Sequence, residues 1–157
     1  MSEVTVQEAD FDVAAEIAAL GQGRDDVGAI ATFVGCVRGG AAEAGVSALT
    51  LEHYPGMTER AIEGMIAEAN RRFRLLGTRV IHRVGRLEPG ARIVLVAVAS
   101  AHRRDAFEGC EFLMDYLKTH APFWKKEETP EGERWVDARI ADDEALARWG
   151  IDSRNAG

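Results

Sequence analysis

An uninterrupted apolar segment, Ile93 to Ala99, constrains the fold of this 157-residue chain more than any other part of its sequence. A strand that is apolar on both faces has to be covered on both, as the central strands of layered sheets are. Apolar residues at helical spacing follow over residues 103–118 and predict a helix that packs on the sheet. The side chains expected to face the core from this helix are those of Ala106, Phe107, Cys110, Leu113, Met114 and Leu117.

The remaining patterns alternate between strand and helix. We expect two strands, 28–37 and 46–54, to form a hairpin around the glycine-rich loop 39–45. A Thr-Pro-Glu-Gly turn predicts a second, C-terminal β-hairpin between residues 124–128 and 134–138. The other predicted elements are strands at 4–6 and 78–84 and helices at about 12–20, 57–73 and 142–149.

Together these elements predict an α+β fold with one mainly antiparallel sheet, two long packed helices and a C-terminal β-hairpin. A chain of this length suits a single domain, and no repeat, linker or low-complexity tract divides it. We assign the domain to residues 1–150 and expect residues 151–157 to be a frayed tail.

Composition and charge exclude several classes of protein. The chain carries 26 acidic residues against 19 Lys and Arg, for a net charge of −7, which argues against binding to nucleic acid or to an anionic membrane surface. No apolar run reaches the length of a membrane span, and the first residues lack a secretory pattern. The two cysteines are too few for a disulfide framework, and the histidines lack metal-site spacing. We therefore expect a cytoplasmic protein without a metal site.

A proline break separates lysines that stand among aromatic residues in the stretch 116–126. Pro122 lacks an amide hydrogen and biases Ala121 away from helical angles, so the helix that carries Lys118 is expected to end there. The chain then emerges extended, and Lys125 can fold back toward Lys118. Converging ammonium groups repel one another unless an anion lies between them, so the stretch predicts an anion-binding or catalytic corner. The alternative is a lysine that merely favours the last turn of its helix.

Basic residues also stand at the start of a predicted helix and at the end of a predicted strand. His102 and Arg103 stand at the helix start, where free amides attract anions, although arginines there can instead pair with acidic residues of the same helix. Arg38 ends a strand before a glycine-rich loop, either as a functional side chain or as a solvated strand end. Cys36 is expected to point to the same side as Arg38, as a sulfur-carrying thiol or as a small hydrophobe.

Six segments of the chain, in order, resemble the large, catalytic subunit of molybdopterin synthase. They are residues 32–38, 49–57, 81–85, 100–103, 114–125 and 130–136. The resemblance implies a hammerhead-like α/β arrangement and a sulfurtransferase of molybdenum cofactor biosynthesis that converts cyclic pyranopterin monophosphate into molybdopterin. It also implies that two sulfurs come from a thiocarboxylate on the C-terminal Gly-Gly of a small ubiquitin-like carrier subunit. Two copies of this chain would form the homodimer within a heterotetramer.

The resemblance also assigns roles to individual residues. It implies that Lys118 is the essential lysine nearest the reacting carbon and that Lys125 is the second essential lysine. The residues implied in substrate binding are Arg38, His102, Arg103, Lys126, Glu127 and Arg139, the last of them contributed across the dimer. No metal or redox cofactor is implied for this step, and molybdenum would enter afterwards.

Two other functions remain open at the level of the sequence. A cysteine-persulfide sulfurtransferase would use Cys36 as its sulfur carrier, and replacement of Cys36 by Ala would then abolish turnover. A non-enzymatic module that binds a phosphorylated metabolite would bind its ligand without consuming sulfur. These alternatives differ from the leading one in whether Lys118 is needed for turnover.

Overall fold

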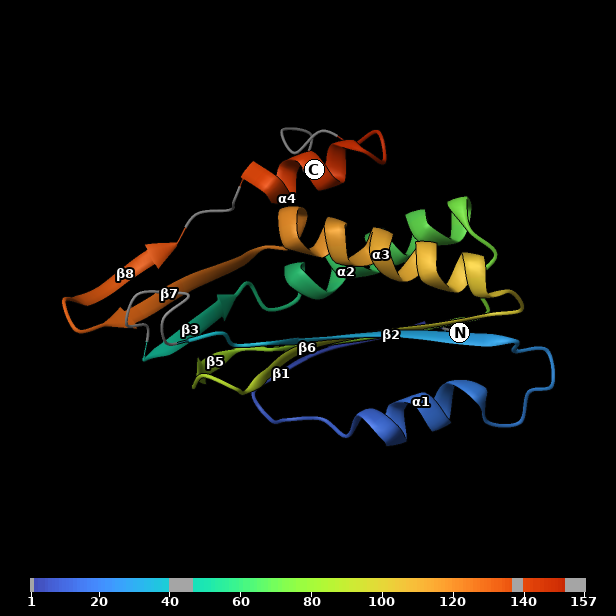
Figure 1. Ribbon diagram of the computed structural model, residues 1–157, viewed down its shortest axis with the longest axis horizontal. Coiled ribbons are helices and arrows are strands. Elements are labelled where there is room, and N and C mark those ends of the chain that lie inside the picture. The colour runs from blue at the N-terminus through green and yellow to red at the C-terminus, as the bar shows by residue number, and fades with distance from the viewer. Residues whose placement is uncertain (1, 40–46, 137–139, 152–157) are drawn as a thin grey trace.

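The computed structural model describes residues 2–39, 47–136 and 140–151. In these residues the chain forms two β-sheets and four helices, arranged in layers (Figure 1). The elements are, in chain order, β1 (Ser2–Gln7), α1 (Val13–Gly21), β2 (Ala29–Cys36), β3 (Ala48–His53), α2 (Met57–Arg72), β4 (Gly77–Arg83), β5 (Gly85–Leu87), β6 (Arg92–Ser100), α3 (Arg103–His120), β7 (Phe123–Thr129), β8 (Gly132–Val136) and α4 (Ile140–Ala147).

β6 lies inside the first sheet, whose strand order is β1-β4-β6-β2. It pairs antiparallel with β4 and β2, while β1 runs parallel to β4. The helices α2 and α3 cover one face of this sheet, and α1 covers the other (Figure 1). Val96 and Val98 pack in the core cluster that contains α2 and α3, whereas Ala97 and Ala99 pack in the cluster that contains α1. The apolar segment is therefore buried on both faces, as predicted.

The second sheet has the strand order β5-β3-β7-β8 and is antiparallel throughout. Its strand β7 follows directly after α3 in the chain. β7 then turns into β8 at Gly132, whose φ of 114° favours glycine. The C-terminal hairpin is thus confirmed, and so is the α+β class.

The prediction of a single sheet was wrong, and so was the hairpin expected between 28–37 and 46–54. β2 is registered with β6 along its length, from Ala29 opposite Ser100 to Cys36 opposite Arg92, whereas β3 pairs with β5 and β7. Hydrophobic pattern identifies a strand but not its partner, and sequence neighbours do not always pair. Residues 40–46 of the expected hairpin loop lie outside the described residues.

The two long helices, α2 and α3, contribute most of the main core, as predicted. The buried stripe of α3 centres on Ala106, Cys110 and Leu113. Phe107 lies at the edge of this stripe and is 66% exposed, so the prediction that it faces the core was wrong. This exposed aromatic ring lies near the start of α3, next to Arg103 and Arg104.

The residues that follow α4 contact α3 through polar groups. Asp115 accepts hydrogen bonds from the indole Nε1 of Trp149 (2.7 Å) and from the guanidinium of Arg148 (2.8 Å). The ring of Trp149 also packs edge-to-face on Phe73 and Phe112. The end of the described chain is thereby fixed on the two long helices.

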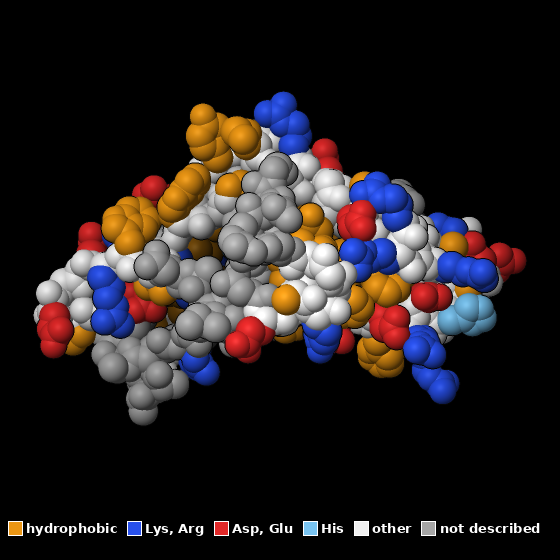
Figure 2. Space-filling view, turned by 90° about the horizontal axis from the view of Figure 1, so that it is seen from above, with side chains coloured by type: hydrophobic (Ala, Val, Ile, Leu, Met, Phe, Trp, Pro, Cys, Tyr) orange, Lys and Arg blue, Asp and Glu red, His pale blue; other side chains and the backbone are white. Residues whose placement is uncertain are grey.

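The surface over α4 is mixed in charge. Figure 2 shows basic and acidic side chains interspersed on this face, and the basic side chains that are coloured form no continuous patch. In the described part of the chain, no helix combines the length and the apolar character that crossing a membrane requires.

Leu113 tests the packing of the main core, because its side chain is fully buried there. We expect Leu113→Ala to lower the free energy of unfolding by about 2–5 kcal/mol, since it leaves a cavity between α3 and its neighbours. Leu113→Met nearly conserves volume and should cost less than about 1.5 kcal/mol. Urea denaturation measures both values. A loss below about 0.5 kcal/mol for Leu113→Ala, as at a surface position, would contradict this packing.

Candidate active site

The proline break after α3 turns the chain directly into β7. Ala121 is the C-cap, with φ −69° and ψ 131°, and its amide donates a hydrogen bond to the carbonyl of Leu117 (3.4 Å). Phe123, two residues further on, already begins β7. The predicted end of the helix before Pro122 is confirmed, and Lys118 stands in its last turn.

A buried hydroxyl from α2 holds this break. Thr58 is fully buried, and its Oγ1 donates a hydrogen bond to the carbonyl oxygen of Pro122 (3.2 Å) while it accepts one from the amide of Tyr54 (3.0 Å). One hydroxyl thus links the start of α2 to the turn between α3 and β7. The placement of Lys118 relative to Lys125 depends on this turn.

A cavity of about 560 Å³ opens beside the break. Its charged lining comes from Arg38 after β2, Lys118 of α3, and Lys125 and Glu127 of β7. The structure therefore brings Arg38 together with Lys118 and Lys125, which belong to a distant segment of the sequence. The apolar lining includes Phe33, Leu49, Leu51, Ile93, Leu117 and Phe123.

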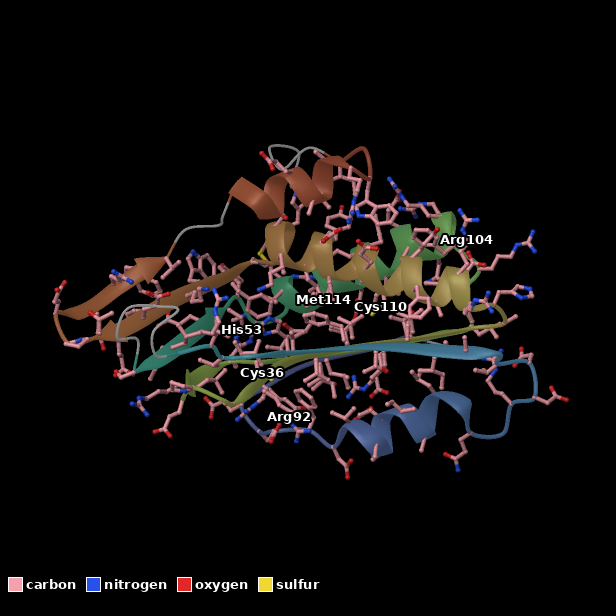
Figure 3. The ribbon with its side chains drawn as sticks, viewed as in Figure 1. Cys36, His53, Arg92, Arg104, Cys110 and Met114 are labelled. Carbon is pink, nitrogen blue, oxygen red and sulfur yellow. The ribbon has the colours of Figure 1, made fainter. Side chains whose placement is uncertain are left out.

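The two cysteines occupy different environments. Cys36 is exposed, lines the cavity and lies at the end of β2, toward the second sheet (Figure 3). Cys110 is buried in the main core, where its thiol is 3.7 Å from the carbonyl oxygen of Val96. Burial raises the pKa of the Cys110 thiol to about 11, so this cysteine is part of the core and Cys36 is the accessible one.

His82 of β4 lines the same cavity, although the sequence did not single it out. Its ring stacks on that of Phe123 (3.8 Å between centroids, 21° between planes), and its Nδ1 lies 2.9 Å from the carbonyl oxygen of Arg83. Burial lowers the pKa of His82 to about 4, with smaller contributions from the charges of Lys118 and His53. The ring is therefore neutral near pH 7. The signal in the sequence was a histidine directly after the apolar pair Val80 and Ile81, one residue before the end of its strand.

Alternation along β7 separates its charged residues into two groups. Lys125 and Glu127 line the cavity, and Glu127 is nearly fully buried. The guanidinium of Arg134 donates two hydrogen bonds to one carboxylate oxygen of Glu127 (3.0 and 2.9 Å). Lys126 points to the other face, 3.4 Å from a carboxylate oxygen of Glu133 and over the ring of Trp135. Substrate contacts by Lys126 and Glu127 stay predictions. Glu127 would make its contact from the cavity lining, and Lys126 from the opposite face of β7.

The predicted anion site at the start of α3 is separate from the cavity within one chain. Lys118 follows Arg103 by 15 residues of continuous helix, which corresponds to about 22 Å along the axis. Figure 3 shows Arg104 at the start of α3, well away from Cys36. Arg104 pairs with Glu108 (3.0 Å), as the alternative for this end of the helix had it.

Two further expectations concern Arg139 and metal binding. Arg139 lies outside the described residues. Within the residues that the structure describes, His, Cys, Asp and Glu side chains form no group of three that could hold a metal ion.

Comparisons with known proteins agree on one family. The model of the family described as "MoaE protein" matches residues 6–120. The molybdopterin synthase catalytic subunit of Ralstonia nicotianae is 59% identical over 99% of this chain and 89% of that protein. The structure of the molybdopterin biosynthesis MoaE protein from Burkholderia ambifaria has a TM-score of 0.83 and 56% identity, covering 97% of this chain and 100% of that one. Molybdopterin synthase from Staphylococcus aureus has a TM-score of 0.76 and 28% identity over 84% and 95%.

The hydroxyl of Thr58 can be tested by a nearly isosteric change. Thr58→Val leaves the Pro122 carbonyl and the Tyr54 amide without this partner in a buried place, and we expect it to cost about 1–3 kcal/mol of unfolding free energy. Thr58→Ser keeps the hydroxyl and should cost only the lost methyl group, about 1 kcal/mol or less. Urea denaturation of both variants gives the comparison. If Thr58→Val is as stable as the wild type, the hydroxyl does not hold the turn.

Proposed function

Because this chain belongs to the MoaE protein family, we propose that it is the catalytic subunit of a molybdopterin synthase and converts cyclic pyranopterin monophosphate into molybdopterin. The observation that carries the proposal is the convergence of Arg38, Lys118 and Lys125 on one cavity. Such a cavity suits a small anionic substrate, in a chain that is acidic as a whole. Its cysteines are unpaired, which fits the reducing cytoplasm that the sequence predicts.

The sulfur donor in this proposal is a second, smaller polypeptide. A relative described as a catalytic subunit implies that its enzyme contains at least one further subunit. We take this partner to be the ubiquitin-like carrier, whose C-terminal Gly-Gly thiocarboxylate enters the cavity. Two glycines have no side chains, so such a tail can enter the cavity where a bulkier one could not.

The chemistry of the cavity follows from charge. Thiocarboxylate and cyclic phosphate are both anions, and they would repel each other at reacting distance. Arg38 and Lys125 hold the phosphorylated substrate, and Lys118 neutralises the incoming thiocarboxylate. After attack the displaced oxygen needs a proton, and the Lys118 ammonium donates it.

A second copy of the chain would explain how His102 and Arg103 can contact the substrate. They lie about 22 Å along α3 from the Lys118 of their own chain, so we propose that they contact the substrate in the cavity of a second copy. The exposed Phe107 one turn further along α3 supports a protein contact at this end of the helix. The assembly would then be a homodimer with one carrier on each copy.

The decisive comparison is between Lys118 and Cys36. With thiocarboxylated carrier and cyclic pyranopterin monophosphate, we expect Lys118→Ala to reduce dithiolene formation by about 100-fold or more, because the acid and the anion contact are both lost. Cys36→Ala should retain most of the activity. Product mass measures both. Normal turnover by Lys118→Ala would overturn the proposed mechanism, whereas loss only in Cys36→Ala would favour the persulfide alternative.

The two-copy site can be tested by complementation. Lys118→Ala and Arg103→Ala chains should each be nearly inactive alone. The two chains are co-expressed with different affinity tags. If they assort at random, half of the dimers are mixed, and each mixed dimer holds one intact site of two. The co-expressed chains should therefore regain about a quarter of the wild-type activity. A mixture no more active than its parents would show that Arg103 acts within its own chain or not at all.

A further inference from the structure

The ring of His82 lines the cavity and is held by two contacts. Its Nδ1 lies 2.9 Å from the carbonyl oxygen of Arg83, and a carbonyl can only accept, so the neutral ring carries its hydrogen on Nδ1. Stacking on Phe123 at 3.8 Å restrains the ring plane. The lone pair of the neutral ring is therefore on Nε2, and His82 lines the cavity beside Lys118 and Lys125.

The charged side chains of the described lining are less suited to accept a proton. Protonated Lys118 and Lys125 and the guanidinium of Arg38 are donors without a lone pair. Glu127 lines the cavity as well, but one of its carboxylate oxygens already accepts two hydrogen bonds from the guanidinium of Arg134. His82 thus adds a neutral nitrogen base to a cavity otherwise dominated by cations.

The environment of His82 explains why its ring is neutral and can accept a proton. Burial is the main cause of its lowered pKa, and the charge of Lys118 adds to it. Anions that bind beside Lys118 would offset that charge and raise the pKa of the ring. The base would therefore be strengthened when the cavity is occupied.

We propose that His82 is the general base of the hydrolytic step that frees the carrier from the pterin. This inference rests on the proposed function, in which sulfur transfer leaves the carrier's C-terminal carbonyl joined to a substrate sulfur. The oxygen of a water molecule bonds to that carbonyl carbon, and the carbon–sulfur bond breaks with its electron pair going to sulfur. One water proton passes to Nε2 of His82 and from there to sulfur. The resulting carboxylic acid ionises to solvent, and the ring returns to its neutral form.

The test uses the full chain in a single turnover with thiocarboxylated carrier. His82→Phe keeps an aromatic ring to stack on Phe123 but removes Nε2. We expect it to consume the thiocarboxylate at a rate near that of the wild type, while release of the carrier slows by about 100-fold or more. A covalent carrier–pterin adduct should then accumulate and be seen by mass. His53→Phe, at the neighbouring histidine on β3, is the matched control and should show no adduct.

A second variant keeps the inference testable if His82→Phe folds poorly. His82→Gly leaves space for a free imidazole, and added imidazole should speed release of the carrier from this variant but not from His53→Gly. A wild type that leaves the thiocarboxylate intact would overturn the proposed function and this inference with it. Carrier release at the wild-type rate from His82→Phe, or an adduct that accumulates in Glu127→Gln instead, would overturn this inference alone.

Discussion

The carbonyl of Pro122 accepts a hydrogen bond from the buried hydroxyl of Thr58, and this contact fixes the point at which α3 gives way to β7. Proline prevents the helix from continuing, but it does not by itself decide where the chain goes next. The hydroxyl from α2 and the stacking of Phe123 on His82 fix the exit of the chain on two sides. Lys118 before the turn and Lys125 after it consequently line the same cavity.

The electrostatics of the cavity follow from this placement. Arg38, Lys118 and Lys125 converge on one cavity whose lining also includes apolar side chains. Among the described residues of the lining, the carboxylate is that of Glu127, and it is paired with Arg134. An anionic substrate would add negative charge beside Arg38, Lys118 and Lys125. Alternation along β7 keeps Lys126 out of this group, so the number of converging cations is limited by strand geometry.

The helices and strands that the sequence predicted correctly are those with a regular spacing of apolar residues or with a residue such as proline that ends a helix. The buried strand at 93–99, both long helices, the break at Pro122 and the C-terminal hairpin were all predicted from such patterns. The pairing of the strands was not predictable, because the sequences of β2 and β3 carry no pattern that assigns them to different sheets. β5 was missed for a similar reason, since three residues carry no periodicity.

Only part of the candidate site was predictable from local sequence patterns. Lys118 and Lys125 were predicted to meet because a nearby proline turn joins them. That Arg38 meets them is an expectation the family resemblance supplied, and the cavity agrees with it. The sequence did not predict His82 as a site residue. Its ring stacks on Phe123 and its Nδ1 contacts the carbonyl of Arg83, and both contacts depend on the tertiary structure. The distance of His102 and Arg103 from the cavity is likewise a property of the folded helix, about 22 Å along its axis.

The central claim is that Lys118 and Lys125 act together on one reacting centre. The most direct measurement is the rate at which the thiocarboxylated carrier loses sulfur in a single turnover, compared among the wild type, Lys118→Ala, Lys125→Ala and the double variant. If the lysines act as a unit, the double variant should be about as slow as the slower single variant, because either loss already disrupts the shared centre. Losses that multiply in the double variant would show that the two lysines act independently, and would contradict this account.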